Sequence, residues 1–148
     1  MAGPNATPIP PVILIGLEVL DRITADAARY AGKSERGGIF IGLRRGPHIE
    51  INEATLPMRW DLGSMFAFRR SSRGHQSVAL RRWRDSARTM DWVGEWHSHP
   101  PFSSVSPSRD DRILMEHLTT VLNRDGEPAV MIIIGSEEEI SFNVRSAT

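Results

Sequence analysis

A run of six apolar residues, Ala129–Ile134, constrains the fold more than any other stretch of the sequence. The run contains no polar side chain at all. A strand with one face in water alternates apolar and polar residues, whereas a continuous apolar run is typical of a strand buried on both faces. We therefore expect a central sheet that is covered by helices.

Hydrophobic periodicity predicts three helices that can cover this sheet. Leu20, Ile23 and Ala27 recur at helical spacing and indicate a helix over residues 18–31. Two further helices are expected over residues 77–88, with Trp83 and Ala87 facing inward, and over residues 108–123.

Strands are expected between these helices. They cover residues 12–15, 37–43, 48–54, 91–97 and 140–144 in addition to the apolar run, and residues 65–69 could form another. Residues 44–47 are typical of a hairpin turn, and residues 71–74 of a loop. This alternation of elements predicts an α/β or α+β fold.

Length and composition suit one ordinary domain. We expect it to span residues 12–148, after a Pro-rich lead-in of residues 1–11. No apolar stretch approaches the roughly 20 residues of a membrane span, and no basic segment precedes an apolar run as in a secretory signal. We therefore expect a cytoplasmic protein without a membrane partner. The chain has no cysteine, which excludes thiolate ligands and a cysteine nucleophile.

The formal net charge is zero, but arginines gather between residues 69 and 88. Such a run usually forms a solvated helix face. The alternative is a docking face for an acidic partner. A nucleic acid is a weaker candidate for that partner than an acidic protein. The members of the arginine cluster are Arg69, Arg70, Arg73, Arg81, Arg82, Arg84 and Arg88.

Two histidines, His97 and His99, lie two residues apart at the end of the strand predicted at 91–97. Side chains at i and i+2 of a strand point to the same face, so both imidazoles can reach one ion. Catalytic zinc is often held by two histidines and a carboxylate, and either Asp110 or Asp111 can supply the carboxylate. The same aspartates also fit a structural role, because Ser108 and Asp111 have the spacing of a helix capping box.

The wider pattern resembles the JAMM family, the MPN-plus metalloproteases. Its elements occur here in the family order: S-E-R-G-G-I-F-I-G at residues 34–42, H-S-H-P at 97–100 and P-S-x-x-D at 107–111. The resemblance covers residues 12–144 and implies a single-domain MPN fold, which is deaminase-like, with a mixed sheet flanked by helices. One departure is a loop before Ser108 that is one residue longer than the family's usual spacing, which keeps Asp110 as an alternative ligand.

The resemblance implies a role for each matching residue. His97, His99 and Asp111 would bind Zn2+. Glu35 would take a proton from the attacking water and return it to the leaving amine, and Ser108 would donate a hydrogen bond to the developing oxyanion. Glu95 is the local rival of Glu35, because strand alternation places it on the face of the histidines.

The implied activity is zinc-dependent cleavage of peptide or isopeptide bonds, most often at the C-terminus of a ubiquitin-like protein. Small bacterial members of the family accompany E1-like and E2-like conjugation enzymes, some of them in antiphage systems. We expect a ubiquitin-like tail to lie across residues 56–76 as an added strand. The alternatives are an inactive MPN-type scaffold and a binding module that uses the arginine cluster. A zinc deaminase is excluded, because its P-C-x-x-C motif needs cysteine.

Overall fold

The computed structural model describes residues 9–58, 61–63, 68–69, 72–100, 103–122, 128–135 and 139–145. The helices of this described part are α1 (Leu17–Arg29), α2 (Ser72–Asp85) and α3 (Arg109–Leu122). Its strands are β1 (Ile13–Ile15), β2 (Gly37–Arg45), β3 (His48–Ala54), β4 (Leu62–Gly63), β5 (Phe68–Arg69), β6 (Met90–Ser98), β7 (Ala129–Ile134) and β8 (Ile140–Arg145). No helix of the described residues combines the length and the apolar character that crossing a membrane requires.

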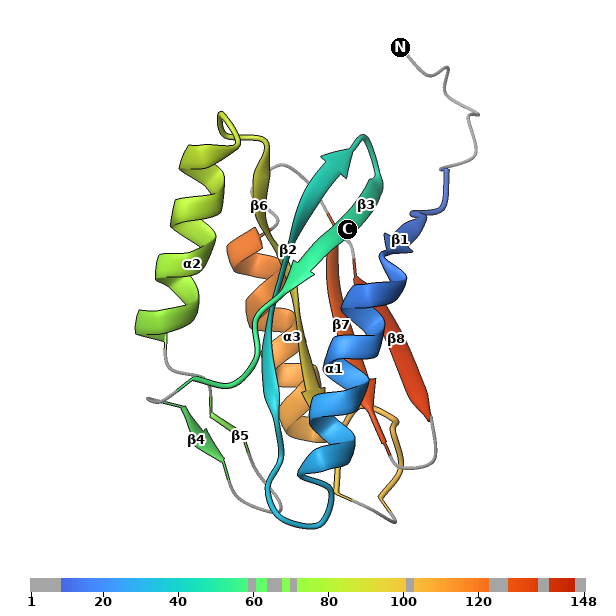
Figure 1. Ribbon diagram of the computed structural model, residues 1–148. Helices are drawn as coiled ribbons and strands as arrows, with labels where there is room; N and C mark the ends of the chain where they lie inside the picture. The colour runs from blue at the N-terminus through green and yellow to red at the C-terminus, as the bar shows by residue number, and fades with distance from the viewer. Residues whose placement is uncertain are drawn as a thin grey trace.

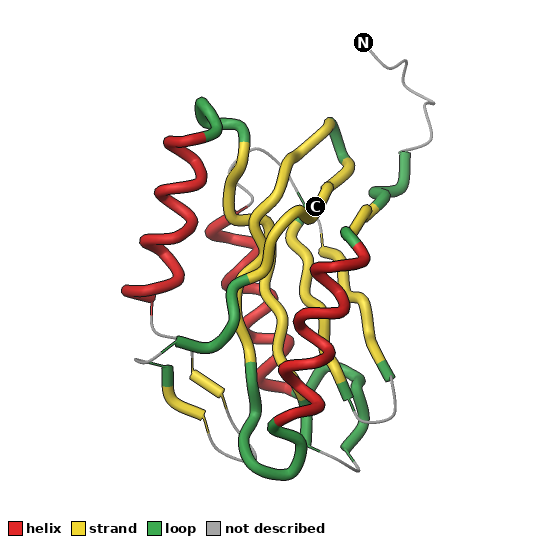
Figure 2. Tube along the Cα trace, in the orientation of Figure 1, coloured by secondary structure: helices red, strands yellow, loops and turns green. Residues whose placement is uncertain are grey.

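The main sheet has six strands in the order β1-β3-β2-β6-β7-β8. The pairs β1–β3 and β6–β7 are parallel, and the other neighbours are antiparallel, so the sheet is mixed. The short strands β4 and β5 form a separate hairpin beside it (Figure 2). The hairpin between β2 and β3 turns at Gly46, whose φ of 59° lies in the region that glycine adopts without steric cost.

Helices cover both faces of the sheet, as the apolar run predicted. Helix α1 lies on one face, and α2 and α3 lie on the other (Figure 1). All six residues of β7 are buried. Its alternate side chains pack against the two layers: Ile132 belongs to the apolar cluster that contains Ile23 of α1, and Met131 belongs to the one that contains Met115 of α3. The prediction of an α/β fold with a covered central sheet is therefore confirmed.

A β-bulge at Val93 changes which face the tryptophans of β6 occupy. Phe40 of β2 pairs with Gly94 and Ile41 pairs with Trp92, so Val93 is an extra residue in β6. Strict alternation along the sequence predicts that Trp92 and Trp96 share one face of the strand, opposite the histidines. That expectation is wrong for Trp92, which packs on the α2 and α3 side, whereas Trp96 packs on the α1 side.

Helix α2 differs from its predicted bounds at both ends. It begins at Ser72, so the loop expected at residues 71–74 is wrong for residues 72–74. It ends at Asp85, and Ala87 follows it with a φ of 55° instead of facing inward. The N–H of Arg88 then donates to the carbonyl of Trp83 at 2.7 Å, in the manner of a Schellman cap formed without glycine. The missing glycine explains why the sequence did not indicate this end.

Candidate metal centre

The end of β6 brings the two histidines together. His97 lies in β6, and His99 follows its last residue, Ser98. The N–H of His99 donates to the carbonyl of Ile134 at 2.9 Å, which holds this segment against the end of β7. The two Nε2 atoms lie 3.3 Å apart, and the ring centroids are separated by 5.2 Å. The structure therefore brings the two imidazoles together as the sequence predicted.

Asp111, in the first turn of α3, completes this group. Its Oδ1 lies 2.9 Å from Nε2 of His97, and its Oδ2 lies 2.8 Å from Nε2 of His99. Asp111 is buried, whereas the alternative ligand Asp110 is exposed. Of the two aspartates, the structure thus brings Asp111 to the histidines, despite the longer loop before Ser108.

The donor set of His97, His99 and Asp111 fits a divalent metal ion. A tetrahedral ion with bonds of about 2.0–2.1 Å separates its ligand atoms by roughly 3.3 Å. The two Nε2 atoms have this separation, and the carboxylate oxygens of Asp111 lie closer to them, at 2.9 and 2.8 Å. The Nδ1 atom of His99 lies 2.7 Å from the carbonyl of Ser104, and because a carbonyl only accepts, Nδ1 carries a proton, which leaves Nε2 of the neutral ring free to bind a metal ion. Either a proton on Nε2 or a metal ion can therefore lie between His99 and the carboxylate of Asp111.

Electrostatics within the group agree with this geometry. Burial alone would raise the pKa of Asp111, but hydrogen bonds from His97 and His99 outweigh it and hold that pKa well below its usual range. The hydrogen bond to Asp111 raises the pKa of His99 against the opposing effect of burial. The site therefore favours a carboxylate at Asp111, which is the form that binds metal.

Ser108 forms the capping box that its spacing predicted. Its hydroxyl accepts the N–H of Asp111 at 3.1 Å, and its own N–H donates to Oδ2 of Asp111 at 2.8 Å. In this contact the hydroxyl acts as an acceptor, and a serine hydroxyl also carries one proton to donate. The structural role of Ser108 therefore leaves its proton for a hydrogen bond to a substrate.

Glu35 lies between the end of α1 and the start of β2. Burial raises the pKa of Glu35, the positive charges of His97 and His99 lower it, and the charge of Asp111 raises it again. These interactions place Glu35 within electrostatic reach of all three candidate ligands. Its rival Glu95 is buried in β6, on the face that α2 and α3 cover.

The position of Glu35 is fixed by its neighbour Arg36. The N–H of Arg36 donates to the hydroxyl of Ser98 at 2.8 Å, and the N–H of Ser98 donates to the carbonyl of Arg36 at 2.9 Å. The guanidinium of Arg36 makes two hydrogen bonds to Asp26 of α1 and stacks 3.9 Å above the ring of Tyr30. The residue after the candidate base is thus tied both to α1 and to the residue between the two histidines.

A buried network around His75 also supports this region, and no pattern in the sequence indicates it. Nδ1 of His75 lies 2.6 Å from the hydroxyl of Thr55, and Nε2 lies 2.6 Å from Asp61. The same hydroxyl accepts the N–H of Ile39 in β2. No motif spacing relates these residues, so only the fold reveals that they meet.

Close packing joins this network to the start of β2. A side chain at Gly38 would collide with the carbonyl of Thr55, so only glycine fits there. The same carbonyl accepts the indole N–H of Trp96 at 2.8 Å. The network therefore holds β2, beside Glu35, and β6, beside His97, in a fixed relation.

The arginine cluster is partly neutralised. Arg82 makes two hydrogen bonds to Glu53, and the guanidinium of Arg88 lies over the ring of Trp83. Arg70 and the side chains of Arg69 and Arg73 lie outside the described residues. The contacts of Arg82 and Arg88 are those of a solvated face.

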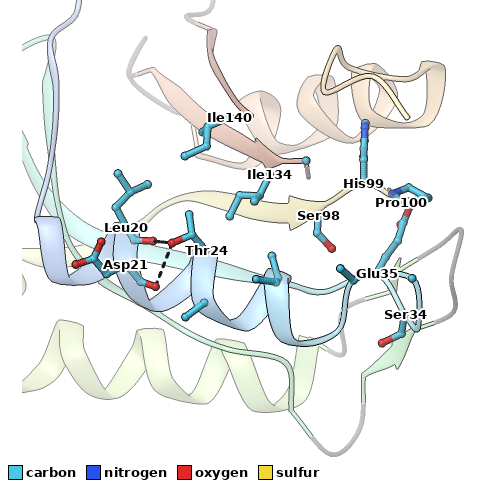
Figure 3. Close-up of a pocket in the computed structure, with 16 residues that line it drawn as sticks. Leu20, Asp21, Thr24, Ser34, Glu35, Ser98, His99, Pro100, Ile134 and Ile140 are labelled. Carbon is cyan, nitrogen blue, oxygen red and sulfur yellow. Dashed lines mark hydrogen bonds between the residues drawn. The ribbon is translucent and has the colours of Figure 1, made fainter. Parts of the chain in front are cut away.

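A cavity of about 670 Å³ opens beside the candidate site. Glu35, Ser98, His99 and Pro100 line one end of it, and α1 forms one wall (Figure 3). Glu35 and one of the candidate ligands, His99, therefore border the same space, which is large enough for a polypeptide segment.

Comparison with known proteins gives matches along most of the chain. Residues 17–146 match the family described as prokaryotic homologs of the JAB domain. A CD-NTase/cGAS isopeptidase of Pseudomonas aeruginosa is 38% identical over 101 residues, which cover 68% of this chain and 63% of that protein. The matched part thus spans less than two thirds of the length of that relative.

Two further proteins are similar over a larger share of their length. A probable metalloprotease of Sinorhizobium fredii is 29% identical over 136 residues, which cover 88% of this chain and 80% of that protein. A protein of Desulfitobacterium hafniense with a known solution structure superposes with a TM-score of 0.65 at 18% identity, over 92% of this chain and 90% of that one. At that identity the second likeness concerns the fold alone.

Proposed function

Because this chain belongs to the family of prokaryotic homologs of the JAB domain and has its single-domain MPN fold, we propose that it is a zinc-dependent hydrolase of isopeptide or peptide bonds. The observation that carries the proposal is the convergence of His97, His99 and Asp111, with ligand atoms within 4.8 Å of one another. An inactive scaffold has no need for three converging ligand groups.

His97, His99 and Asp111 would hold the ion through Nε2, Nε2 and the carboxylate. Bound zinc would supply a Lewis acid and so lower the barrier to attack by water at neutral pH. The carbonyl of Ser104 keeps the ring of His99 in the orientation that binding requires.

Glu35 and Ser108 carry out the proton transfer and the stabilisation of the oxyanion in this reaction. Glu35 takes a proton from the attacking water and passes it to the leaving amine, as a general base and then a general acid. Its burial favours this exchange, because a raised pKa brings a carboxylate closer to the pH at which it works. The hydroxyl of Ser108 donates to the carbonyl oxygen as negative charge develops on it.

The substrate is, on this proposal, a conjugate formed through the C-terminus of a protein tail. The names of the relatives point to an isopeptide bond in a CD-NTase system. We further propose that this tail belongs to a ubiquitin-like protein and that E1-like and E2-like conjugation enzymes are partners of the chain. We place that tail across residues 56–76, part of which lies outside the described residues.

The proposal is tested by metal content and by cleavage. Zinc-supplied wild-type protein should contain one ion per chain and should cut a CD-NTase or a ubiquitin-like protein fused at its C-terminus to a reporter. The variant Glu35→Gln should keep the metal and lose about 10²–10⁴-fold in kcat. Equal cleavage by both proteins would contradict the role of Glu35, and the lack of stoichiometric metal in the wild type would favour the scaffold.

A further inference from the structure

The cavity beside Glu35 is a groove whose lining is mainly apolar. One wall is formed by Leu20 and Ala28 of α1 and by Ala31 just beyond the end of the helix, and the opposite wall is formed by Ile134 at the end of β7 and Ile140 at the start of β8. Figure 3 shows Leu20 on α1 facing the side of the groove that holds Ile134 and Ile140. The groove runs from these residues to Glu35 and His99.

The groove exists because α1 leaves the last strand of the sheet uncovered. Ile140, Phe142 and Val144 of β8 pair with Ile134, Ile132 and Val130, so they share the face on which α1 packs. Phe142 is nevertheless 54% exposed. Apolar surface therefore continues along β8 beside the groove, where a bound chain could cover it.

The position of Glu35 indicates which part of a substrate the groove receives. Glu35, Ser98 and His99 line it, whereas Ser108 and Asp111 do not. In the proposed reaction Glu35 delivers the proton to the leaving amine, and Ser108 contacts the carbonyl oxygen. A groove that begins at Glu35 and away from Ser108 therefore lies on the side of the leaving amine.

Length and charge define the ligand further. From Asp21 to Arg29, the last residue of α1, the helix rises by about 12 Å, at roughly 1.5 Å per residue. An extended chain covers that distance with about four residues, and reaching Glu35, which lies beyond this end of the helix, takes at least one more. The acidic residues Asp21 and Glu35 belong to the lining, and no lysine or arginine does among the described residues. A basic side chain in the bound segment would meet Asp21.

We propose that the groove between α1 and β8 binds an extended, apolar segment of the leaving chain, with a basic residue about five positions from the residue that carries the leaving amine. The inference rests on the proposed function for its direction. The binding of a peptide to the groove can be measured without any hydrolysis, so the two proposals can fail separately.

The test uses a fluorescein-labelled heptapeptide, Gly-Val-Leu-Ala-Val-Arg-Ser, and zinc-supplied protein, with binding followed by fluorescence anisotropy. The variant Ala28→Trp fills the groove from an exposed position of α1 and should weaken binding at least tenfold. The matched control Arg22→Trp adds the same ring to the same helix outside the groove and should bind as the wild type does.

Charge is tested with a second peptide in which glutamate replaces arginine. It should bind the wild type several-fold more weakly than the first peptide, and Asp21→Asn should reduce that difference. Equal binding by Ala28→Trp and the wild type, or no binding of the first peptide by the wild type, would overturn the proposal that the groove binds this segment. If the peptide binds in the groove but zinc-supplied wild type cuts no conjugate, the groove stands and the hydrolase proposal falls.

Discussion

Arg36 and Ser98 are joined by a reciprocal pair of hydrogen bonds: each backbone N–H donates to the other residue, to the hydroxyl of Ser98 in one direction and to the carbonyl of Arg36 in the other. This pair links the residue after Glu35 to the residue between His97 and His99. The separation between the candidate base and the candidate ligands is therefore set by the backbone as well as by side-chain packing.

The Ser98→Ala variant should lower kcat several-fold and leave KM and the zinc content unchanged. The substitution leaves the N–H of Arg36 without its side-chain acceptor, at a cost of about 1 kcal/mol, and loosens Glu35. Steady-state kinetics and metal analysis of the same preparation measure both effects. Ser103→Ala, at an exposed position of the next loop, is the control and should behave as the wild type does. A kcat equal to the wild-type value would show that the pair does not position the base.

The two neighbouring aspartates provide a matched test of the third ligand. Asp111→Asn should lose zinc and activity, because it removes the carboxylate that faces both histidines. Asp110→Asn should retain zinc, because Asp110 is exposed whereas the buried Asp111 contacts both histidines. Metal content measured after dialysis distinguishes the variants. Loss of zinc in Asp110→Asn alone would transfer the ligand role to Asp110.

The sequence predicted the elements of this fold where the signal was local. The apolar run of β7 and the pair His97 and His99 are local features, and the family resemblance drawn from the short motifs is confirmed. Features that depend on distant contacts were missed. The bulge at Val93, which reverses the face of Trp92, arises from pairing with β2, and the burial of His75 needs Thr55 and Asp61 from another part of the chain.

The stability of the metal-free protein should depend on pH through His99 and Asp111. The pKa of Asp111 is lowered by folding, so its contribution is present above about pH 4, its unfolded pKa, and is lost as pH falls toward the folded value. The pKa of His99 is raised, so its contribution is present below about pH 6.5 and is lost as pH rises through the folded value. The pair therefore contributes most between about pH 4 and 6.5.

Thermal melting of chelator-treated protein across this range checks the prediction. The difference in Tm between the wild type and Asp111→Asn should be largest between about pH 4 and 6.5 and should shrink on either side. The variant Asp110→Asn controls for the loss of one negative charge near the start of α3. A difference that stays constant across the whole range would mean that the pair is not ionised as described.

Ser108 combines a structural role with the proposed contact to the oxyanion, and the two can be measured separately. Ser108→Ala removes the cap of α3 and should lower the free energy of unfolding by about 1 kcal/mol. It should also lower kcat by roughly 10²-fold if its proton stabilises the oxyanion. Ser108→Thr, which keeps the hydroxyl, should recover most of both losses. Loss of stability without loss of kcat would leave Ser108 with the capping role alone.

His75→Phe should lower the free energy of unfolding by about 3 kcal/mol. The ring of His75 is fully buried, and its removal leaves the nearly buried carboxylate of Asp61 without its imidazole partner and the hydroxyl of Thr55 without an acceptor. Because Thr55 also accepts the N–H of Ile39 in β2, the loss should extend toward Glu35 and lower kcat as well. Urea denaturation measures the first effect. His117→Phe, at an exposed position of α3, should change stability by less than about 0.5 kcal/mol. A loss in His75→Phe no larger than in His117→Phe would show that Thr55 and Asp61 keep their places without the imidazole.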